Sequence, residues 1–141
     1  MDINPYLIFN GNCAEAFRFY ERALGGTIVC LLTHGETPSR EHVPTEWHDK
    51  IVHARLEVNG RAIMGSDGCP DDVLNPKGIY VSFAVDHTEE AERIFKALSE
   101  GATITMPFEK TFWSPGFGML VDRFGIPWMV NTVLQPEPAY A

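Results

Sequence analysis

Three groups of residues could bind a ligand or a metal ion, judged by their types and spacing. The first group includes His53 and Arg55. These two residues are two positions apart in a strand-like run, so their side chains lie on the same face of the strand. There they could bind an anionic or enolic ligand by charge and hydrogen bonding. Two other roles stay open: His53 could bond local backbone groups, and Arg55 could pair with Glu57 or an acidic loop residue. Asp67 could join His53 as a nonstandard metal ligand or a general base, or it could form the turn before Gly68.

A second group of candidate metal ligands lies between residues 34 and 49. It contains His34, Glu36, His42 and His48. A folded loop could bring two or three of them together, but their spacings match no zinc template. The simpler interpretation is a set of solvated loop side chains.

The third group is aromatic and consists of Tyr6, Tyr80 and Trp113. Such side chains could line a cavity and stack on a planar ligand, or they could belong to an ordinary core with their polar atoms bonded. Both interpretations stay open from the sequence alone.

Composition limits the classes of function. The chain has 141 residues, 45% of them apolar, and a net charge of -8, which disfavours binding to nucleic acid or to anionic lipid. No apolar run is long enough to span a membrane, and no secretory leader is recognisable at the start. Cys13, Cys30 and Cys69 are too scattered for a disulfide framework. These features predict a cytoplasmic protein.

The first half contains a helix between strand-like runs. Asn12 and Glu15 have the spacing of a capping box, and apolar residues follow at helical intervals until Gly25 and Gly26. Residues 34–49 predict a long, mobile loop. Asn59-Gly60 predicts a hairpin turn. The expected elements are strands at 5–9, 27–33, 51–58 and 61–66 and a helix at 13–24.

The second half repeats this order after a polar, turn-rich linker at residues 68–77. The expected elements are strands at 79–85, 103–106, 119–122 and 127–133 and a helix at 88–100. A shift of 74 residues also superimposes several apolar positions, which indicates an internal duplication. The sequence thus predicts one α+β domain over residues 1–141. It would have two βαβββ modules, about 1–67 and 78–135, forming a curved, cup-shaped mixed sheet with helices outside.

Alternation along the strands assigns their two faces. The bulky set expected to pack on the helices is Leu7, Phe9, Val81, Phe83, Val85, Trp128 and Val130. The opposite face, lining the cup, would carry Tyr6, Ile8, His53, Arg55, Tyr80, Ser82, Met129 and Asn131. A concave face that mixes apolar and polar groups is where a small ligand would bind.

Several segments resemble the vicinal oxygen chelate superfamily, which includes glyoxalase I, extradiol dioxygenases and bleomycin-resistance proteins. FYERALG at 19–25 is similar to that family's first-helix ending, and DRFG at 122–125 to the turn before its last strand. YLIFNGNCAEA at 6–16, TFWSPGFG at 111–118 and FGIPWMVN at 124–131 resemble its PhnB-like branch, also labelled 3-demethylubiquinone-9 3-methyltransferase-like.

The resemblance implies a divalent metal in the cup, held by His, Gln or Glu side chains, and a homodimer. The residues at the corresponding positions are Tyr80, Met129, Pro5 or Tyr6, and Met64 or Ser66. None suits a hard divalent ion, so no metal is expected at the standard positions. His53 and Asp67 remain weak candidates for a nonstandard metal site.

The preferred prediction is a protein that binds a small organic molecule without making or breaking bonds. His53 and Arg55 would orient its polar groups, and the wall would be formed by Tyr6, Tyr80, Trp113 and Met129. The alternative is a metal-dependent lyase, isomerase or dioxygenase with a rebuilt site, and a third class is a protein-interaction module. No cofactor is predicted, although a divalent metal stays open. The sequence lacks the glycine-rich cofactor loop that a methyltransferase would need.

Overall fold

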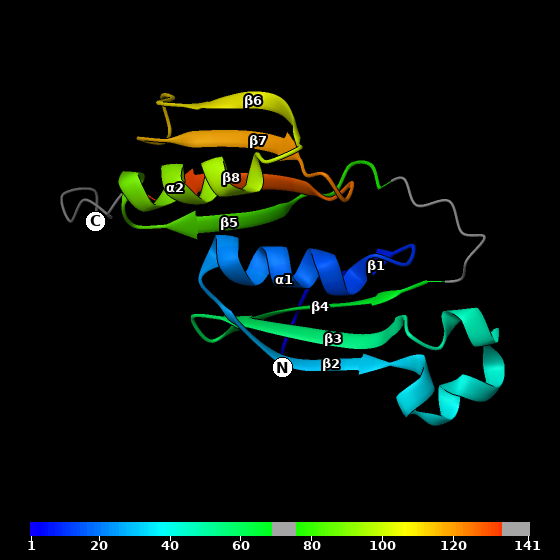
Figure 1. Cartoon of the computed structure of the whole chain (residues 1–141). Coiled ribbons are helices and arrows are strands. Elements are labelled where there is room, and N and C mark those ends of the chain that lie inside the picture. The colour runs from blue at the N-terminus through cyan, green and yellow to red at the C-terminus, as the bar shows by residue number, and fades with distance from the viewer. Residues whose placement is uncertain (69–75, 134–141) are drawn as a thin grey trace. The chain divides into compact units, whose positions relative to one another are not determined.

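The computed structural model describes residues 1–68 and 76–133. The chain divides into two compact units, Met1–Asn75 (unit 1) and Pro76–Ala141 (unit 2), which are drawn in Figure 1. Most of the expected linker, together with Cys69, lies outside the described residues. In the described part of the chain, no helix has the length and apolar character needed to cross a membrane.

In its described residues, 1–68, unit 1 is a four-stranded mixed sheet with one α-helix. Its regular elements are β1 (Tyr6–Phe9), α1 (Cys13–Leu24), β2 (Thr27–Thr33), β3 (Ile51–Val58) and β4 (Arg61–Asp67). The strand order is β1-β4-β3-β2, with β1 parallel to β4 and the other pairs antiparallel. This is the predicted βαβββ module, and the two outer strands of the sheet are β1 and β2.

Unit 2 repeats this topology. Its elements are β5 (Val81–Val85), α2 (Thr88–Leu98), β6 (Thr103–Glu109), β7 (Phe117–Val121) and β8 (Pro127–Thr132), in the strand order β5-β8-β7-β6. The fold-class prediction of two repeated α+β modules is therefore confirmed. Some boundaries differ: the strand expected from Ile79 begins at Val81, and the helix expected to reach Glu100 ends at Leu98.

The start of α1 corrects one detail of the sequence analysis. The side chain of Asn12 makes no capping hydrogen bond, so the predicted capping box does not form. Instead, the carboxylate of Asp67, from the end of β4, accepts from the backbone N–H of Cys13 at 3.0 Å. A buried carboxylate from the sheet thus accepts a hydrogen bond from a free backbone N–H at the start of the helix, where the side chain of Asn12 was expected to do so.

The sequence predicts a long, mobile loop at residues 34–49, and the segment between β2 and β3 forms three short 3-10 helices. These are η1 (His34–Glu36), η2 (Pro38–His42) and η3 (Thr45–Trp47). Backbone hydrogen bonds close the segment at its base, from His34 N to Lys50 O at 2.8 Å and from Gly35 N to His48 O at 2.9 Å. Local turn bonds therefore satisfy backbone groups that a structureless loop would leave to water.

Each helix covers one face of its own sheet, and this face holds the core (Figure 1). In unit 1 the rings of Phe9 and Phe17 meet edge to face, with centroids 6.1 Å apart. In unit 2, Trp128 and Val130 are fully buried. The face assignment from alternation is correct for these residues. Within residues 1–68 and 76–133, the other face of each sheet is not covered by the α-helix of its own unit.

Candidate functional site

The exposed face of unit 1 presents one continuous row of polar and sulfur-containing side chains. Tyr6 of β1 is the register partner of Met64 of β4, and Met64 is in turn the partner of Arg55 of β3. Arg55 is also the partner of Cys30 in β2. Register partners project to the same side of a sheet. We call Tyr6, Met64, Arg55 and Cys30 the unit 1 row.

His53 stands beside this row and is held by Tyr6. The phenol oxygen of Tyr6 lies 3.1 Å from Nδ1 of His53, and the two rings stack with centroids 5.7 Å apart at an angle of 26°. Whichever atom donates the shared proton, the bond orients the imidazole and leaves its Nε2 edge for another partner. Sequence reasoning placed both residues on this face but did not pair them.

Arg55 is held by an ion pair that the sequence left as an alternative. Its Nε donates to Oε2 of Glu57 at 3.0 Å, and its Nη1 lies 3.8 Å from Sδ of Met64. Both charged side chains are more than one third exposed, so solvent screens the pair. Glu57 thus positions the guanidinium across the row and balances its charge.

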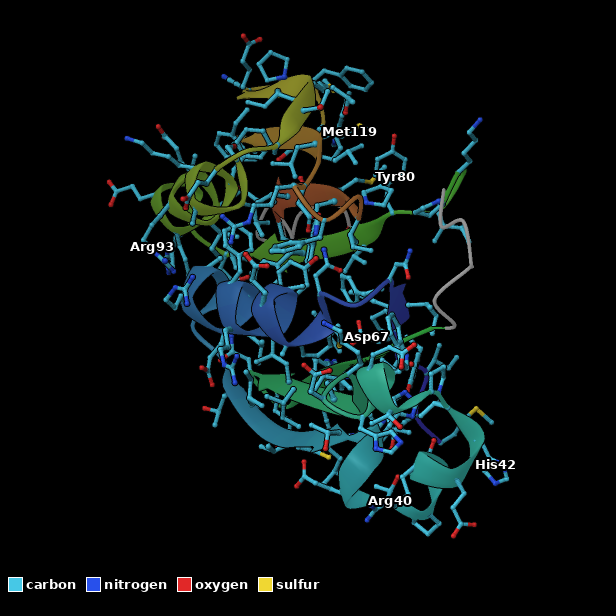
Figure 2. The ribbon with its side chains drawn as sticks, turned by 45° about the vertical axis from the view of Figure 1, so that its right-hand side comes forward. Arg40, His42, Asp67, Tyr80, Arg93 and Met119 are labelled. Atoms are coloured by element: carbon cyan, nitrogen blue, oxygen red, sulfur yellow. The ribbon has the colours of Figure 1, made fainter. Side chains whose placement is uncertain are left out.

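Asp67 lies on the other side of the same sheet from His53. Its Oδ1 accepts from the backbone N–H groups of Gly11 at 2.8 Å and Cys13 at 3.0 Å, and its Oδ2 accepts from Ile51 N at 2.8 Å. The side chain is buried beside the start of α1, as Figure 2 shows. The structure therefore does not bring Asp67 and His53 together, and the carboxylate joins three segments of backbone.

The histidines between β2 and β3 point to separate partners. Nδ1 of the buried His34 lies 2.7 Å from Ser39 Oγ, whereas Nε2 of His48 lies 2.9 Å from Arg40 O. The side chain of Glu36 accepts from Thr33, and these hydrogen bonds lower the pKa of Glu36. Within residues 1–68 and 76–133, no three His, Cys, Asp or Glu side chains are grouped as a metal site would require.

In unit 2 the predicted wall residues come from three places. Met129 lies on β8, on the face away from α2; Tyr80 precedes β5; and Trp113 lies between β6 and β7. The Trp113 ring packs edge to face on Phe117, with centroids 5.4 Å apart, and remains 44% exposed. Figure 2 shows Tyr80 and Met119 on the side of the unit 2 sheet that faces away from α2.

Sequence reasoning missed two residues of the unit 2 face. Met119 is the register partner of Met129, and Met106 is the register partner of Met119. Alternation along residues 119–122 could have placed Met119 on this face. The position of Met106 could not be read in the same way, because the β6–β7 register shifts on both sides of it.

Comparison with known proteins identifies relatives along nearly the whole chain. A family model described as 3-demethylubiquinone-9 3-methyltransferase matches residues 1–131. Protein YjdN of Escherichia coli K12 is 36% identical over 143 residues, which cover 96% of this chain and 97% of that protein. The crystal structure of protein PA1353 from Pseudomonas aeruginosa is 48% identical with a TM-score of 0.86, covering 96% of this chain and 99% of the other.

More distant structures share the fold. The PhnB protein from Bacillus cereus is 23% identical with a TM-score of 0.77, covering 94% of this chain and all of the other. A glyoxalase/bleomycin resistance protein/dioxygenase family enzyme from Burkholderia phytofirmans PsJN is 15% identical with a TM-score of 0.62, covering 93% and 97%. The chain therefore belongs to the PhnB-like family whose model is described as 3-demethylubiquinone-9 3-methyltransferase, and it has the glyoxalase/bleomycin resistance/dioxygenase fold.

Proposed function

We propose that this protein binds a small organic molecule on an exposed sheet face, and that each unit presents one such surface of its own. His53 and Arg55 supply the polar contacts in unit 1, beside the ring of Tyr6. In unit 2 the ligand-facing surface is assigned to Tyr80, Trp113 and Met129. All of these residues were expected from the sequence. The contacts of Tyr6, His53 and Arg55 in unit 1 give the proposal its most direct support.

The observation that carries the proposal is the hydrogen-bonded and stacked pair of Tyr6 and His53. Tyr6 is 44% exposed although its neighbours Leu7 and Phe9 are buried, so the pair contributes little to the core. An ordered, solvent-facing pair of a phenol and an imidazole, next to a guanidinium, is suited to recognising the oxygen atoms of a small molecule. A planar ligand could also stack on the aromatic rings.

The residue types at the standard metal positions of the fold argue against a divalent ion there. Met129 and Met64 offer thioethers, which are poor ligands for hard divalent cations. In addition, the Arg55 guanidinium lies 3.8 Å from the Met64 sulfur, so a positive charge already occupies the space beside it. These residues do not fit the metal that the fold family implies, and the proposed binding requires none.

The methyltransferase description is not extended to this chain in the proposal. Methyl transfer from a nucleotide-derived cofactor calls for a glycine-rich loop after a strand, and the turn after β1 is Asn10-Gly11-Asn12. In the described residues, the first turn of α1 instead receives the Asp67 carboxylate. That negative charge would repel an anionic cofactor group at this helix terminus.

We further propose that the protein is a homodimer located in the cytoplasm.

The test follows the imidazole of His53 by NMR of ¹³C-labelled histidine. The probes are benzoate, catechol and phenylpyruvate, which represent an anionic, a vicinal-diol and an enolisable ligand. At least one probe is expected to shift the His53 ring signal until it saturates. The proposal fails if no probe does so, or if His42, which lies in η2, shifts in parallel with His53.

A matched pair of arginine variants makes this test specific. Arg55→Gln removes the guanidinium of the unit 1 row, whereas Arg61→Gln removes one from the exposed start of β4. Arg55→Gln is expected to weaken probe binding at least tenfold, and Arg61→Gln is expected to leave it unchanged. Equal effects of the two variants would show that probe binding depends only on the net charge of the protein, which would contradict the proposed role of Arg55.

A further inference from the structure

Three methionines occupy neighbouring positions on three adjacent strands of unit 2. Met106 in β6 pairs with Met119 in β7, and Met119 pairs with Met129 in β8. Adjacent strands are about 4.8 Å apart, and register partners project to the same face. Three of the five methionines of the chain therefore meet on one surface. We call Met106, Met119 and Met129 the methionine row.

A bulge in β6 completes the methionine row. Ile104 pairs with Leu120 and Met106 pairs with Met119, so Thr105 is an extra residue in β6. In a regular ladder Thr105, and not Met106, would stand opposite Met119. Bulges re-aim side chains and are frequent next to functional sites. The bulge thus places the thioether of Met106 opposite Met119, in the position that the hydroxyl of Thr105 would otherwise take.

The methionine row lies outside the fully buried core of unit 2. Leu120 and Trp128, which immediately adjoin Met119 and Met129 in sequence, point to the α2 side and are fully buried. The three methionines are on the opposite face and are half-buried. Part of each residue is therefore accessible to solvent, and each flexible side chain can adjust its position.

Thioether sulfur is a soft, neutral ligand that prefers soft monovalent ions to the hard divalent ions of the standard site. We propose that the methionine row binds one soft monovalent cation, with Cu(I) as the biological ion. Met106, Met119 and Met129 each supply one sulfur, and the central position of Met119 makes it the essential ligand. This site shares Met129 with the surface proposed for the organic ligand in unit 2, whereas Met106 and Met119 belong to the methionine row alone.

Unit 1 provides an internal control. Met64 also lies on an exposed sheet face, but its register partners are Tyr6 and Arg55, and the guanidinium lies 3.8 Å from its sulfur. A single thioether beside a positive charge is a poor site for any cation. Met64 is therefore expected to stay free of metal while the methionine row is occupied.

The experiment uses Ag(I), a redox-stable analogue of Cu(I), and observes the ¹³C-labelled methyl groups of all five methionines by NMR. The full chain carries Cys30→Ser and Cys69→Ser so that these thiols do not compete, while Cys13 is fully buried. One equivalent of Ag(I) is expected to shift the signals of Met106, Met119 and Met129 together. The signals of Met64 and Met1 are expected to stay in place.

Leucine variants then assign the site, because leucine keeps the apolar volume and removes the sulfur. Met119→Leu is expected to weaken Ag(I) binding at least tenfold, and Met64→Leu is expected to have no effect. Met106→Leu provides a second variant if Met119→Leu perturbs the circular dichroism spectrum. Anaerobic competition with a Cu(I) chelator is expected to give the same order of affinities.

Three results would overturn the proposal. All five methyl signals could shift in parallel, which would indicate nonspecific binding to thioethers. Alternatively, none of the three row signals could move at several equivalents of Ag(I). Finally, Met119→Leu could bind Ag(I) as tightly as Met64→Leu does. None of these results would affect the proposed ligand contacts of His53 and Arg55, so the two proposals are separately testable.

Discussion

Unit 1 and unit 2 share a strand order, but their exposed faces carry different chemistry. From one outer strand to the other, the row in unit 1 is Tyr6, Met64, Arg55 and Cys30, and the row in unit 2 is Ser82, Met129, Met119 and Met106. Both outer strands, β2 and β6, are bulged just before the last residue of the row. The helix-facing core maintains the repeated architecture, whereas the exposed face is free to differ because no core packing depends on it.

The two units also differ in how a buried aspartate is used. Asp67 accepts backbone hydrogen bonds from Gly11, Cys13 and Ile51, which are distant in sequence. Asp122 accepts from Phe124 N, Ile126 N and Trp128 Nε1, all within six residues. Unit 1 is therefore joined by a long-range carboxylate, and the β7–β8 turn of unit 2 by a local one.

The largest expected effect comes from breaking these carboxylate contacts. Asp67→Ala leaves three backbone N–H groups without their acceptor, two of them buried, and is expected to lower the free energy of unfolding by about 4 kcal/mol. Asp122→Ala is expected to cost about 3 kcal/mol, because local turn bonds such as Gly125 N to Asp122 O can persist. Urea denaturation measures both costs.

Hydrogen exchange would show which segments each aspartate variant destabilises. Asp67→Ala should lose protection in α1 and at the start of β3, the segments that the carboxylate joins. Asp122→Ala should lose protection first in the β7–β8 turn. Equal loss over both units in either variant would contradict the distinction between a long-range and a local contact.

A smaller effect is expected at two glycines, Gly65 and Gly118, where a helix comes close to its sheet. A Cβ atom on Gly65 would lie 2.7 Å from the Leu7 carbonyl oxygen and 2.7 Å from the Phe17 ring of α1. On Gly118 it would lie 2.7 Å from the Phe95 ring of α2. Each substitution by alanine is expected to cost about 2 kcal/mol through overpacking.

The control for these variants is Gly60→Ala. A Cβ atom there would meet nothing within 4 Å, so only the strain of its positive φ of 77° would add to the cost. Thermal unfolding should therefore rank Gly65→Ala below Gly60→Ala in stability. If Gly65→Ala is tolerated and Gly118→Ala is not, the helix contacts of the two units are not equivalent.

The smallest expected effect is an alkaline sensitivity confined to unit 1. Burial raises the pKa of the Cys13 thiol, and the nearby Asp67 carboxylate adds to this increase. The folded state therefore keeps the thiol protonated, whereas the unfolded chain releases its proton above a pKa of about 8.5. Below that pH the thiol does not reduce the free energy of unfolding. Above it the free energy of unfolding decreases, by about 1 kcal/mol between pH 8.5 and pH 9.5.

Urea denaturation between pH 8 and pH 9.5 measures this dependence. Cys13→Ala should remove it, and Cys30→Ala should retain it, because Cys30 is only half-buried. The corresponding first residue of α2 is Thr88, which does not ionise in this range. Exchange rates in α2 should accordingly change less with pH than those in α1. The same pH slope in wild type and Cys13→Ala would contradict the prediction.

Much of the fold could be predicted from the sequence because its signals are local. The Asn59-Gly60 turn, the helical spacing of residues 13–24 and the strand alternation each depend on neighbouring residues, and they gave the element order of both units. The motifs at 6–16, 111–118 and 124–131 indicated the family. Local signals failed at Asn12, where a carboxylate from β4 caps the helix, and at residues 34–49, where backbone turns form without apolar periodicity.

The residue types available on the exposed faces follow from the amino-acid sequence alone: an imidazole, a guanidinium, aromatic rings and thioethers. The partners of these side chains, in contrast, depend on how the strands are arranged in the folded protein. This arrangement paired Tyr6 with His53 and Arg55 with Glu57, placed Asp67 on the opposite side of the sheet, and brought Met106 into line with two other methionines. The reason is that alternation specifies a side of one strand, whereas a neighbour across the sheet depends on register and on bulges, which strands distant in sequence set together.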